Sequence, residues 1–444
     1  MQRKLERSRA HFRQAAKRLP LGVASNFRYW GDDDTFYIER AEGGRLWDID
    51  GNAYIDYRLG YGPTILGYCD PRVDAAAMEG MRQGSVFALS TERELAVAER
   101  ICKMVPAAEM VRFSCSGTEA VMAALRVARA FSGKDGYVVA EGGYHGVFDA
   151  ALWTTDMEGW SGQGDPELVA YSEGVPGILR SLVWQVPLND ADRLEDLFKR
   201  KADKIGALLI EPIQGNCCAI SADPAYMKAV RELCTRYGVV LIVDEVKTGF
   251  RVARGGAQEI YGIQADLCTY AKAMGNGYPI SALAGRRDIM SIIGQTVVHG
   301  GTFTAHAVSL AAAEKTLEIL DETDALATIA GYGERLREGL AGVLEARGIP
   351  HCFVGHPALS GLFFSETPPA GYRDWKTSDH VFYDTLAPLL VDRGVLIEPD
   401  SREPWFMCEA HAKGGCLEET LKAFAAAVDA TLEQLGDRGQ SAAE

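Results

Sequence analysis

Lys272 and Asp244 are the two residues whose types and positions most directly suggest a catalytic site. Lys272 stands in the glycine-containing segment 271–277, just after the apolar run 263–270. Asp244 closes the apolar run 239–243, and this pattern predicts a buried parallel strand with an acid at its C-terminal edge. A lysine that can form a Schiff base and an acid that can keep a pyridine nitrogen protonated are what pyridoxal 5'-phosphate (PLP) requires. A surface lysine and a helix-capping aspartate are the alternative interpretation.

A candidate phosphate site lies between a short strand expected at 110–113 and a helical stretch at 121–131. Ser116, Gly117 and Thr118 belong to the connecting turn. Free N–H groups at the start of a helix and two hydroxyls can bind a dianion, and the helix dipole assists. An ordinary helix cap, with Ser116 or Thr118 as the capping residue, is equally compatible with this sequence.

The remaining chemistry depends on an aromatic ring and on the state of the lysine. Tyr144 follows the strand expected at 137–140, where a ring can stack on a flat cofactor, although a simple loop aromatic fits as well. A free ammonium is a poor nucleophile, so partial burial beside a cationic ring is expected to lower the pKa of Lys272. The lysine amine would then serve as the general base, which leaves His145 and His299 with structural roles.

Several motifs occur here in the order found in class III aminotransferases. They are Ser-Gly-Thr-Glu-Ala at 116–120, Tyr-His-Gly at 144–146, Ile-Glu-Pro at 210–212, Asp-Glu-Val-x-Thr-Gly-Phe-Arg at 244–251 and Gly-Thr-Phe at 301–303. The resemblance extends from about residue 12 to about residue 428. Within that family, the segments 46–57, 62–67 and 256–258 resemble the branch that contains glutamate semialdehyde aminomutase.

The resemblance implies an α/β architecture, the PLP-dependent transferase fold type I. This fold has a large domain on a mostly parallel sheet and a smaller α+β domain built from both termini. We expect an N-terminal segment of the small domain at 1–70, the large PLP-binding domain at 71–320 and the C-terminal small domain at 321–444. The alternation of strand and helix patterns from 111 to about 285 also predicts a parallel sheet with covered faces, whose ligands bind beyond the C-terminal strand ends.

The resemblance also implies roles for single residues. Lys272 and Asp244 are the expected catalytic residues, on the cofactor aldehyde and on the pyridine nitrogen. The expected cofactor contacts are Ser116, Gly117 and Thr118 on the phosphate, Tyr144 on the ring face, and His145 and Glu211 near the site. Glu211 precedes Pro212 and could equally mark the end of a strand. Thr302 is expected to reach the phosphate of the neighbouring subunit, which would make the protein a homodimer with shared active sites.

Substrate recognition is encoded more weakly than cofactor binding. The segment 20–28 resembles the aminomutase segment whose arginine binds the substrate carboxylate, so Arg28 is the candidate, with a surface role as the alternative. Glu403 matches a glutamate in an aminomutase Phe-Glu-Ala-Gly-Phe segment and is the second candidate. The segments 271–279 and 300–307 depart from the aminomutase loops that hold its special substrate.

These departures favour an ordinary aminotransferase on the aminomutase scaffold. We therefore expect PLP-dependent transfer of an amino group between an amine or amino acid and a 2-oxo acid. The first alternative is glutamate semialdehyde 2,1-aminomutase, or a related intramolecular amino transfer or racemase. The second is a PLP-bound regulator or an inactive scaffold, which lacks support because neither end of the chain has room for a DNA-binding module.

Composition sets further bounds. With 444 residues, 47% of them hydrophobic and 24% charged, the chain is expected to be a soluble globular protein of two or three domains. A net charge of −15 argues against nucleic acid and anionic membranes as partners. Ten scattered cysteines without a C-x-x-C pair favour reduced thiols, a cytoplasmic location and no metal site. Residues 1–20 lack the apolar core of a signal peptide.

The elements that must position these residues can be outlined from periodicity. Helices are expected at 3–19, 71–82, 92–104, 307–319, 326–347 and 417–435. A β-hairpin is expected at 46–57, and strands at 207–210, 239–243, 267–270, 361–365 and 394–397. The polar tail 436–444 is expected to be disordered.

Overall fold

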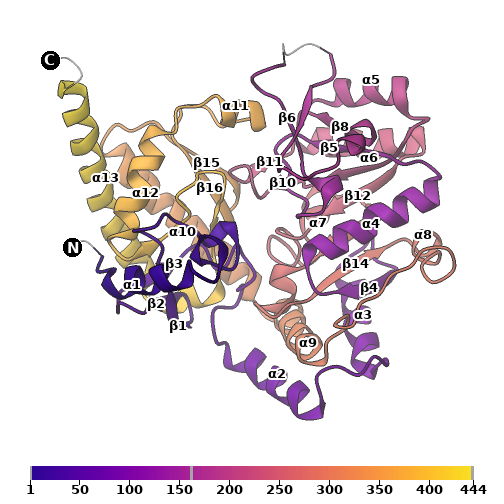
Figure 1. The fold of residues 1–444 in the computed structure, drawn as a ribbon, viewed down its shortest axis with the longest axis horizontal. Helices are drawn as coiled ribbons and strands as arrows, with labels where there is room; N and C mark the ends of the chain where they lie inside the picture. The colour runs from indigo at the N-terminus through magenta and orange to yellow at the C-terminus, as the bar shows by residue number, and fades with distance from the viewer. Residues whose placement is uncertain (1–2, 161–163, 442–444) are drawn as a thin grey trace.

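A seven-stranded sheet is the centre of the larger part of the molecule (Figure 1), and its strand order is β4-β14-β13-β12-β9-β5-β8. The structure is a computed structural model and describes residues 3–160 and 164–441. In sheet order, the strands are β4 (Met110–Ser114), β14 (Ser281–Gly285), β13 (Leu267–Tyr270), β12 (Val240–Asp244), β9 (Ile205–Ile210), β5 (Gly136–Ala140) and β8 (Val183–Val186). The strand β14 is antiparallel to both of its neighbours, and the other pairings are parallel. The expected mostly parallel sheet is confirmed.

Alternation along β12 sends its side chains to two helical layers. Leu241 and Val243 lie in the buried cluster that includes Val230 of α6 (Pro224–Tyr237). Ile242 lies in a second cluster with Ala124 of α4 (Gly117–Ser132). Successive residues of a strand point to opposite faces, so a continuous apolar run is what a sheet covered on both sides requires. Packing on both faces therefore holds the sheet in place, together with the residues at the carboxyl ends of its strands.

The smaller part of the molecule is built from both ends of the chain. Its first sheet has the order β1-β2-β3-β17, with β1 (Ile38–Glu42), β2 (Arg45–Asp48), β3 (Ala53–Asp56) and β17 (Val395–Leu396). β2 and β3 form the expected hairpin, and β17 pairs with β3 in parallel, Val395 opposite Ile55. Its second sheet is β15 (Cys352–His356), β16 (Leu359–Phe363) and β18 (Trp405–Phe406). The domain boundaries at 70 and 320 stay a prediction.

Helices cover both parts (Figure 1). On the larger part and its flank they are α2 (Pro71–Gln83), α3 (Glu92–Met104), α5 (Ala191–Lys201), α7 (Ala257–Tyr261), α8 (Arg287–Met290) and α9 (Ala307–Glu322). On the smaller part they are α1 (Glu6–Ala15), α10 (Ala325–Glu345), α11 (Tyr372–Lys376), α12 (Val381–Val391) and α13 (Cys416–Ser441). The short strands β6 (Trp153–Thr155), β7 (Leu168–Ala170), β10 (Ile213–Gln214) and β11 (Ile220–Ser221) form two-stranded sheets.

Two expectations about the ends of the chain were wrong. The first helix covers Glu6–Ala15 rather than 3–19, since the chain turns away before Pro20 into a short 3₁₀ turn. The last helix continues through the polar residues to Ser441, so 436–441 are helical, whereas 442–444 lie outside the described residues. Within the described chain, no helix is long and apolar enough to cross a membrane, and no group of three or more His, Cys, Asp or Glu side chains could hold a metal ion.

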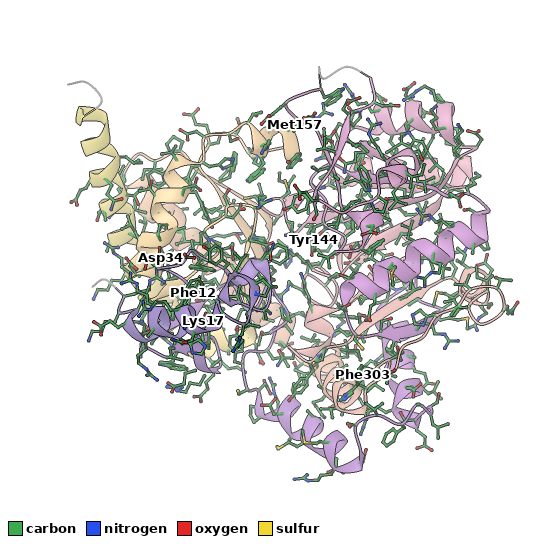
Figure 2. All side chains as sticks on the ribbon, in the orientation of Figure 1. Phe12, Lys17, Asp34, Tyr144, Met157 and Phe303 are labelled. Carbon is green, nitrogen blue, oxygen red and sulfur yellow. The ribbon has the colours of Figure 1, made fainter. Side chains whose placement is uncertain are left out.

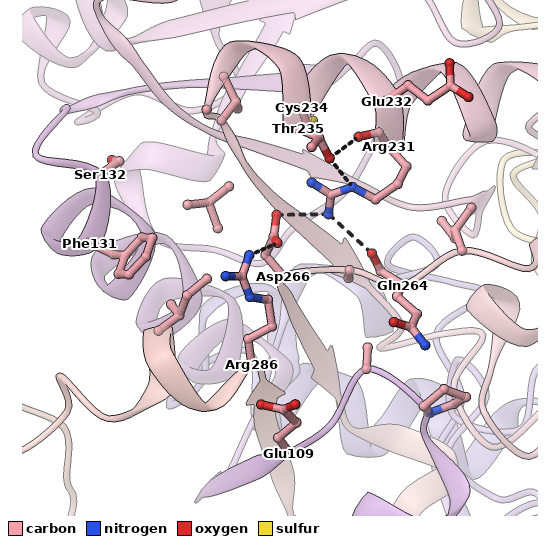
Figure 3. Close-up of a pocket in the computed structure, with 18 of the residues that line it drawn as sticks. Glu109, Phe131, Ser132, Arg231, Glu232, Cys234, Thr235, Gln264, Asp266 and Arg286 are labelled. Atoms are coloured by element: carbon pink, nitrogen blue, oxygen red, sulfur yellow. Dashed lines mark hydrogen bonds and ion pairs between the residues drawn. The ribbon is translucent and has the colours of Figure 1, made fainter.

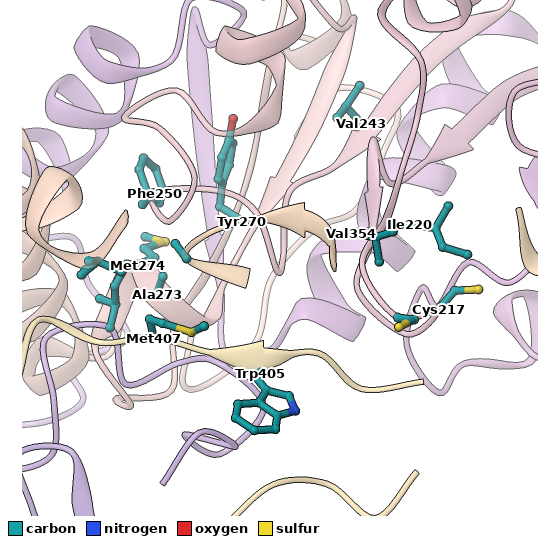
Figure 4. Close-up of a cluster of buried hydrophobic side chains, with 14 of the residues drawn as sticks. Cys217, Ile220, Val243, Phe250, Tyr270, Ala273, Met274, Val354, Trp405 and Met407 are labelled. Atoms are coloured by element: carbon teal, nitrogen blue, oxygen red, sulfur yellow. The ribbon is translucent and has the colours of Figure 1, made fainter. Parts of the chain in front are cut away.

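One continuous core joins the two parts beneath the region of Lys272. Val243 and Tyr270 of the large sheet, Met274 just after the lysine, and Trp405 and Met407 of the small part belong to one buried cluster (Figure 4). Burial of apolar surface across the junction fixes the two parts relative to each other. A site between them can therefore be built from both.

Candidate active site

A cavity of about 250 Å³ lies where the carboxyl ends of the large sheet meet the small part. The large part contributes the residues that follow β5, β9, β12 and β13 and the start of α4, while the small part contributes Phe27, Tyr61 and Glu403. Tyr144 is near this junction in Figure 2. Of the residues nominated from the sequence, the cavity is lined by Gly117, Thr118, Tyr144, His145, Glu211, Asp244, Lys272 and Glu403.

Asp244 ends β12 and is held by three hydrogen bonds. Its Oδ2 lies 2.8 Å from His145 Nδ1, while Oδ1 accepts from the Val246 N–H at 3.0 Å and the Thr269 hydroxyl at 3.2 Å. Both partners of the first contact have side chains only 3% exposed. Because a carboxylate only accepts, His145 must donate from Nδ1. A fixed, buried carboxylate of this kind can hold a proton on a heteroaromatic nitrogen.

Lys272 follows β13 and begins the 3₁₀ turn Lys272–Gly275. Its backbone is left-handed, with φ of 45°. Residues other than glycine rarely adopt this conformation, and where they do, the position is often functional. Burial lowers the pKa of the lysine amine to about 7, and the neighbouring Lys247 ammonium acts in the same direction. A large fraction of the amine is therefore neutral and nucleophilic near neutral pH.

The start of α4 could bind an anion, and a glycine there leaves room for the loop after Asp244. A Cβ at Gly117 would lie 3.0 Å from Val246 Cγ1, so a side chain there would crowd the loop after Asp244. The first N–H groups of a helix have no acceptor within it, and Gly117 and Thr118 are among the residues that line the cavity. Ser116 is the helix N-cap: its hydroxyl accepts from Glu119 N–H at 3.3 Å, and it does not line the cavity. Its phosphate role stays a prediction.

Glu211 fixes the loop that carries Tyr144. One carboxylate oxygen accepts from the Tyr144 N–H at 2.9 Å, and the other accepts from the Gly215 N–H at 3.1 Å. Burial raises the pKa of this carboxyl. The site prediction placed Glu211 near the cofactor, and the contacts show how a strand-end glutamate can also hold the tyrosine in place.

Besides Ser116, two predicted site residues do not line the cavity. Arg28 is exposed and donates to Ser25 Oγ at 2.5 Å, while its neighbour Phe27 lines the wall. Thr302 is exposed next to Phe303, which is beside α9 in Figure 2. The expected cross-subunit role of Thr302 requires a second chain, and its assignment and that of Arg28 stay predictions.

The cavity also contains residues that sequence reasoning missed. Lys247 and Asn216 line it beside Glu403. Lys247 Nζ lies 2.8 Å from Glu403 Oε2, and Asn216 donates its amide to Glu403 Oε1. The sequence did contain a signal for Lys247. It is a charged residue in the motif 244–251, which follows a buried strand, and a buried charge requires a partner.

Comparison with known proteins agrees with this geometry. The class III aminotransferase family profile matches residues 29–400. The chain belongs to this family. It is 38% identical over 422 residues to glutamate-1-semialdehyde 2,1-aminomutase 2 of Brevibacillus brevis, covering 94% of this chain and 97% of that protein.

Solved structures of class III relatives share the whole fold. An omega-transaminase from Sphaerobacter thermophilus has a TM-score of 0.89 at 32% identity, over 95% of this chain and 97% of that one. A transaminase with PLP bound has a TM-score of 0.88 at 27% identity, over 97% of this chain and 99% of that one. The cofactor of this class III enzyme is PLP.

The cavity of this class III enzyme fits that cofactor. The α4 start matches a phosphate dianion, the buried Asp244 matches a protonated pyridine nitrogen, and the amine of Lys272 matches an aldehyde. The Nε2 atom of His145 is buried without a hydrogen-bond partner among the described residues, so it could accept or donate one further hydrogen bond. The donor set is that of a PLP site and not of a metal centre.

Proposed function

We propose that this enzyme is an aminotransferase that moves an amino group between an amine or amino acid and a 2-oxo acid. The observation that supports it most is the lysine amine with a pKa of about 7 in one cavity with the buried Asp244–His145 pair. Membership in the class III family supports amino-group transfer, either between two molecules or within one. The thiols of all ten cysteines are free, which supports a cytoplasmic location.

Lys272 acts twice in this proposal. Its neutral amine would hold the cofactor at the aldehyde carbon. As a free amine it would be the general base that takes the proton from the substrate Cα. PLP, when bound, supplies the electron sink for the pair left on Cα. Since proton transfer is most efficient when the pKa of the base lies near the working pH, a value of about 7 suits both tasks.

The other residues hold the cofactor in register. Asp244 keeps the proton on the ring nitrogen, and His145 fixes the rotamer of Asp244 by donating to Oδ2. Gly117 and Thr118 present N–H groups to the phosphate. Tyr144, whose backbone N–H donates to Glu211, would lie on the ring face.

A homodimer with shared sites is part of the proposal. Large apolar side chains are exposed on and between α2 and α3, among them Met81 at 63% and Leu89 at 81%. Exposed apolar surface of this kind marks a protein interface. Thr302 and the exposed Phe303 would enter the partner's site. Mixing Thr302→Ala with Lys272→Ala chains should give hybrid dimers whose PLP retention differs from both parents, while an active monomer in sedimentation would contradict the dimer.

The second candidate is an intramolecular aminomutase, and it is favoured by the 38% identical relative. In a mutase the intermediate must stay enclosed, whereas a transferase releases a keto product. The segment 300–307 reads Gly-Gly-Thr-Phe-Thr-Ala-His-Ala and differs in size and polarity from the aminomutase loop that encloses the site. This difference supports the transferase.

A single-turnover reaction with an amino donor and no acceptor separates the two. The transferase should release one keto product per site and leave the cofactor as pyridoxamine phosphate. Complete conversion of glutamate semialdehyde to 5-aminolevulinate without any acceptor would establish the mutase instead.

A further inference from the structure

A buried ion pair crosses the cavity between the two parts of the molecule. Lys247 belongs to the loop after β12, and Glu403 belongs to the segment just before β18. Their Nζ and Oε2 atoms are 2.8 Å apart, with side chains 5% and 10% exposed. Both line the wall of the proposed active site. In the roles proposed above, Lys247 acts only through its effect on the pKa of Lys272, and Glu403 has no role.

The side chain of Lys247 is held in the cavity wall by specific packing contacts. A Cβ at Gly215 would collide with Cδ of Lys247, so glycine makes the slot in which the aliphatic stem lies. The ammonium donates to the Gly215 carbonyl at 2.7 Å and lies 5.7 Å from the centre of the Phe406 ring. These contacts fix a positive charge at the cavity before any substrate enters.

Glu403 supplies the anion that this charge requires. Its second carboxylate oxygen accepts from the Asn216 amide, so both oxygens are held by residues of the large part. The amide oxygen of Asn216 is buried without a hydrogen-bond partner in the described part of the chain. This oxygen can only accept, so it would pair with a donor of the substrate and not with its carboxylate. No arginine is among the described residues that line the cavity, and Arg28 is exposed outside it.

We propose that Lys247 is the anchor for the carboxylate of the substrate, and that this carboxylate takes the place of Glu403. The inference rests on the proposed amino transfer and names the feature that its acid substrate must present. Removing one partner of a buried pair leaves an uncompensated charge, whereas exchanging one carboxylate for another keeps Lys247 paired. The displaced Glu403 would keep the Asn216 amide as its donor. A simple amine brings no carboxylate and leaves the Lys247–Glu403 pair intact. One cavity can thus accept an amine in one half-reaction and a 2-oxo acid in the other.

Binding of an unreactive acid to the PLP-loaded enzyme tests the anchor without any turnover. The probes are hexanoate and the neutral hexan-1-ol, and calorimetry gives the ratio of their dissociation constants. Lys247→Met keeps the apolar stem in the Gly215 slot and removes the charge. It should reduce the preference for hexanoate by about tenfold, as expected for loss of one charge-assisted contact. Lys228→Met, on the exposed face of α6, is the matched control and should keep the wild-type ratio.

The variant Glu403→Gln should have the opposite effect, because it removes the competing carboxylate. It should bind hexanoate about fivefold more tightly than the wild type. This second variant decides the question if Lys247→Met fails to fold. An unchanged ratio in Lys247→Met, weaker binding in Glu403→Gln, or no hexanoate binding by the wild type would each overturn the anchor. Failure of amino transfer itself appears separately, in the donor-only single turnover, which requires no carboxylate when the donor is a simple amine.

Discussion

The two ends of the large sheet each carry a cavity, and the smaller one is the proposed active site. At the amino end of β12 and β13, a hollow of about 640 Å³ is lined by Arg231, Asp266 and Arg286 (Figure 3). At the carboxyl end, the cavity with Lys272 and Asp244 has about 250 Å³. Volume alone would select the wrong end.

The difference lies in how the charges are balanced. Asp266 accepts from Arg231 at 2.9 Å, from Arg286 at 2.8 Å and from the Leu241 N–H at 2.8 Å, so its charge is compensated within the protein. At the carboxyl end, burial instead leaves a lysine with a pKa of about 7, and the His145 Nε2 has no partner in the described chain. A balanced ion cluster stabilises, whereas groups held in unusual states are typical of a functional site.

Among changes that test the contrast between the two cavities, removal of Lys272 should have the largest effect. Lys272→Ala should reduce amino transfer about 10⁴-fold or more, since both the attachment point and the base are lost. Borohydride reduction of the wild type followed by peptide mapping should place the cofactor on Lys272. Lys228→Ala, at the amino-end cavity, is the matched control. Label on another lysine would contradict the assignment of the whole site.

A slightly smaller effect is expected for the acid at the carboxyl end. Asp244→Asn should retain PLP through Lys272 and the α4 start but lose about 10³-fold in turnover, because a neutral amide does not keep the ring nitrogen protonated. Cofactor absorbance measures retention, and steady-state kinetics measure turnover. Turnover near that of the wild type would mean that the ring nitrogen has another partner.

The acid at the amino end should behave in the opposite manner. Asp266→Asn should lower the free energy of unfolding by about 2 kcal/mol, because two guanidinium groups lose their buried counter-charge. Turnover at 25 °C should stay within about twofold of the wild type. Asp288→Asn, which removes the exposed partner of the same Arg286, should cost about 0.5 kcal/mol or less. Denaturant unfolding measures both, and a large loss of PLP affinity in Asp266→Asn would remove the contrast.

The smallest effect concerns pH. Covalent capture of PLP by the cofactor-free protein should become about tenfold faster from about pH 6 to about pH 8 and then level off, as the amine with a pKa of about 7 loses its proton. In this protein the free energy of unfolding should rise with pH from about 7 to the ordinary lysine value of 10.5, since only the unfolded chain still holds the proton there. A capture rate that still increases above pH 9 would show an ordinary lysine.

Much of the large sheet, together with Asp244 and Lys272, could be predicted because the sequence patterns that indicate them lie within short segments. The run before Asp244 is apolar at every position, and β12 covers 240–244 against an expected 239–243. Lys272 follows a strand that the structure gives at the expected 267–270. Motif order then supplied the family, since the whole set of motifs is unlikely to recur together by accident.

What could not be predicted depends on contacts between distant segments: Glu403 was predicted from the resemblance, but its partner Lys247 was missed. Lys247 and Glu403 are far apart in sequence, and neither identity nor spacing shows that they meet. The turn Asn26–Arg28 places Phe27 at the wall and leaves Arg28 exposed, a difference of one position that no motif specifies. The hydroxyl of Ser116 satisfies both a phosphate-site pattern and a capping pattern, and the structure shows the cap.

The parallel pairing of β3 with β17 sets the order of events during synthesis on the ribosome. Ile55 emerges early, but its partner Val395 is translated on the order of tens of seconds later at about 5–20 residues per second. Throughout that interval the edge of β3 has no neighbour on that side, and an unpaired edge is where another chain can add. Nascent chains that stall between β14 and β17 have every strand of the large sheet, yet they still expose the unpaired edge of β3 to aggregation.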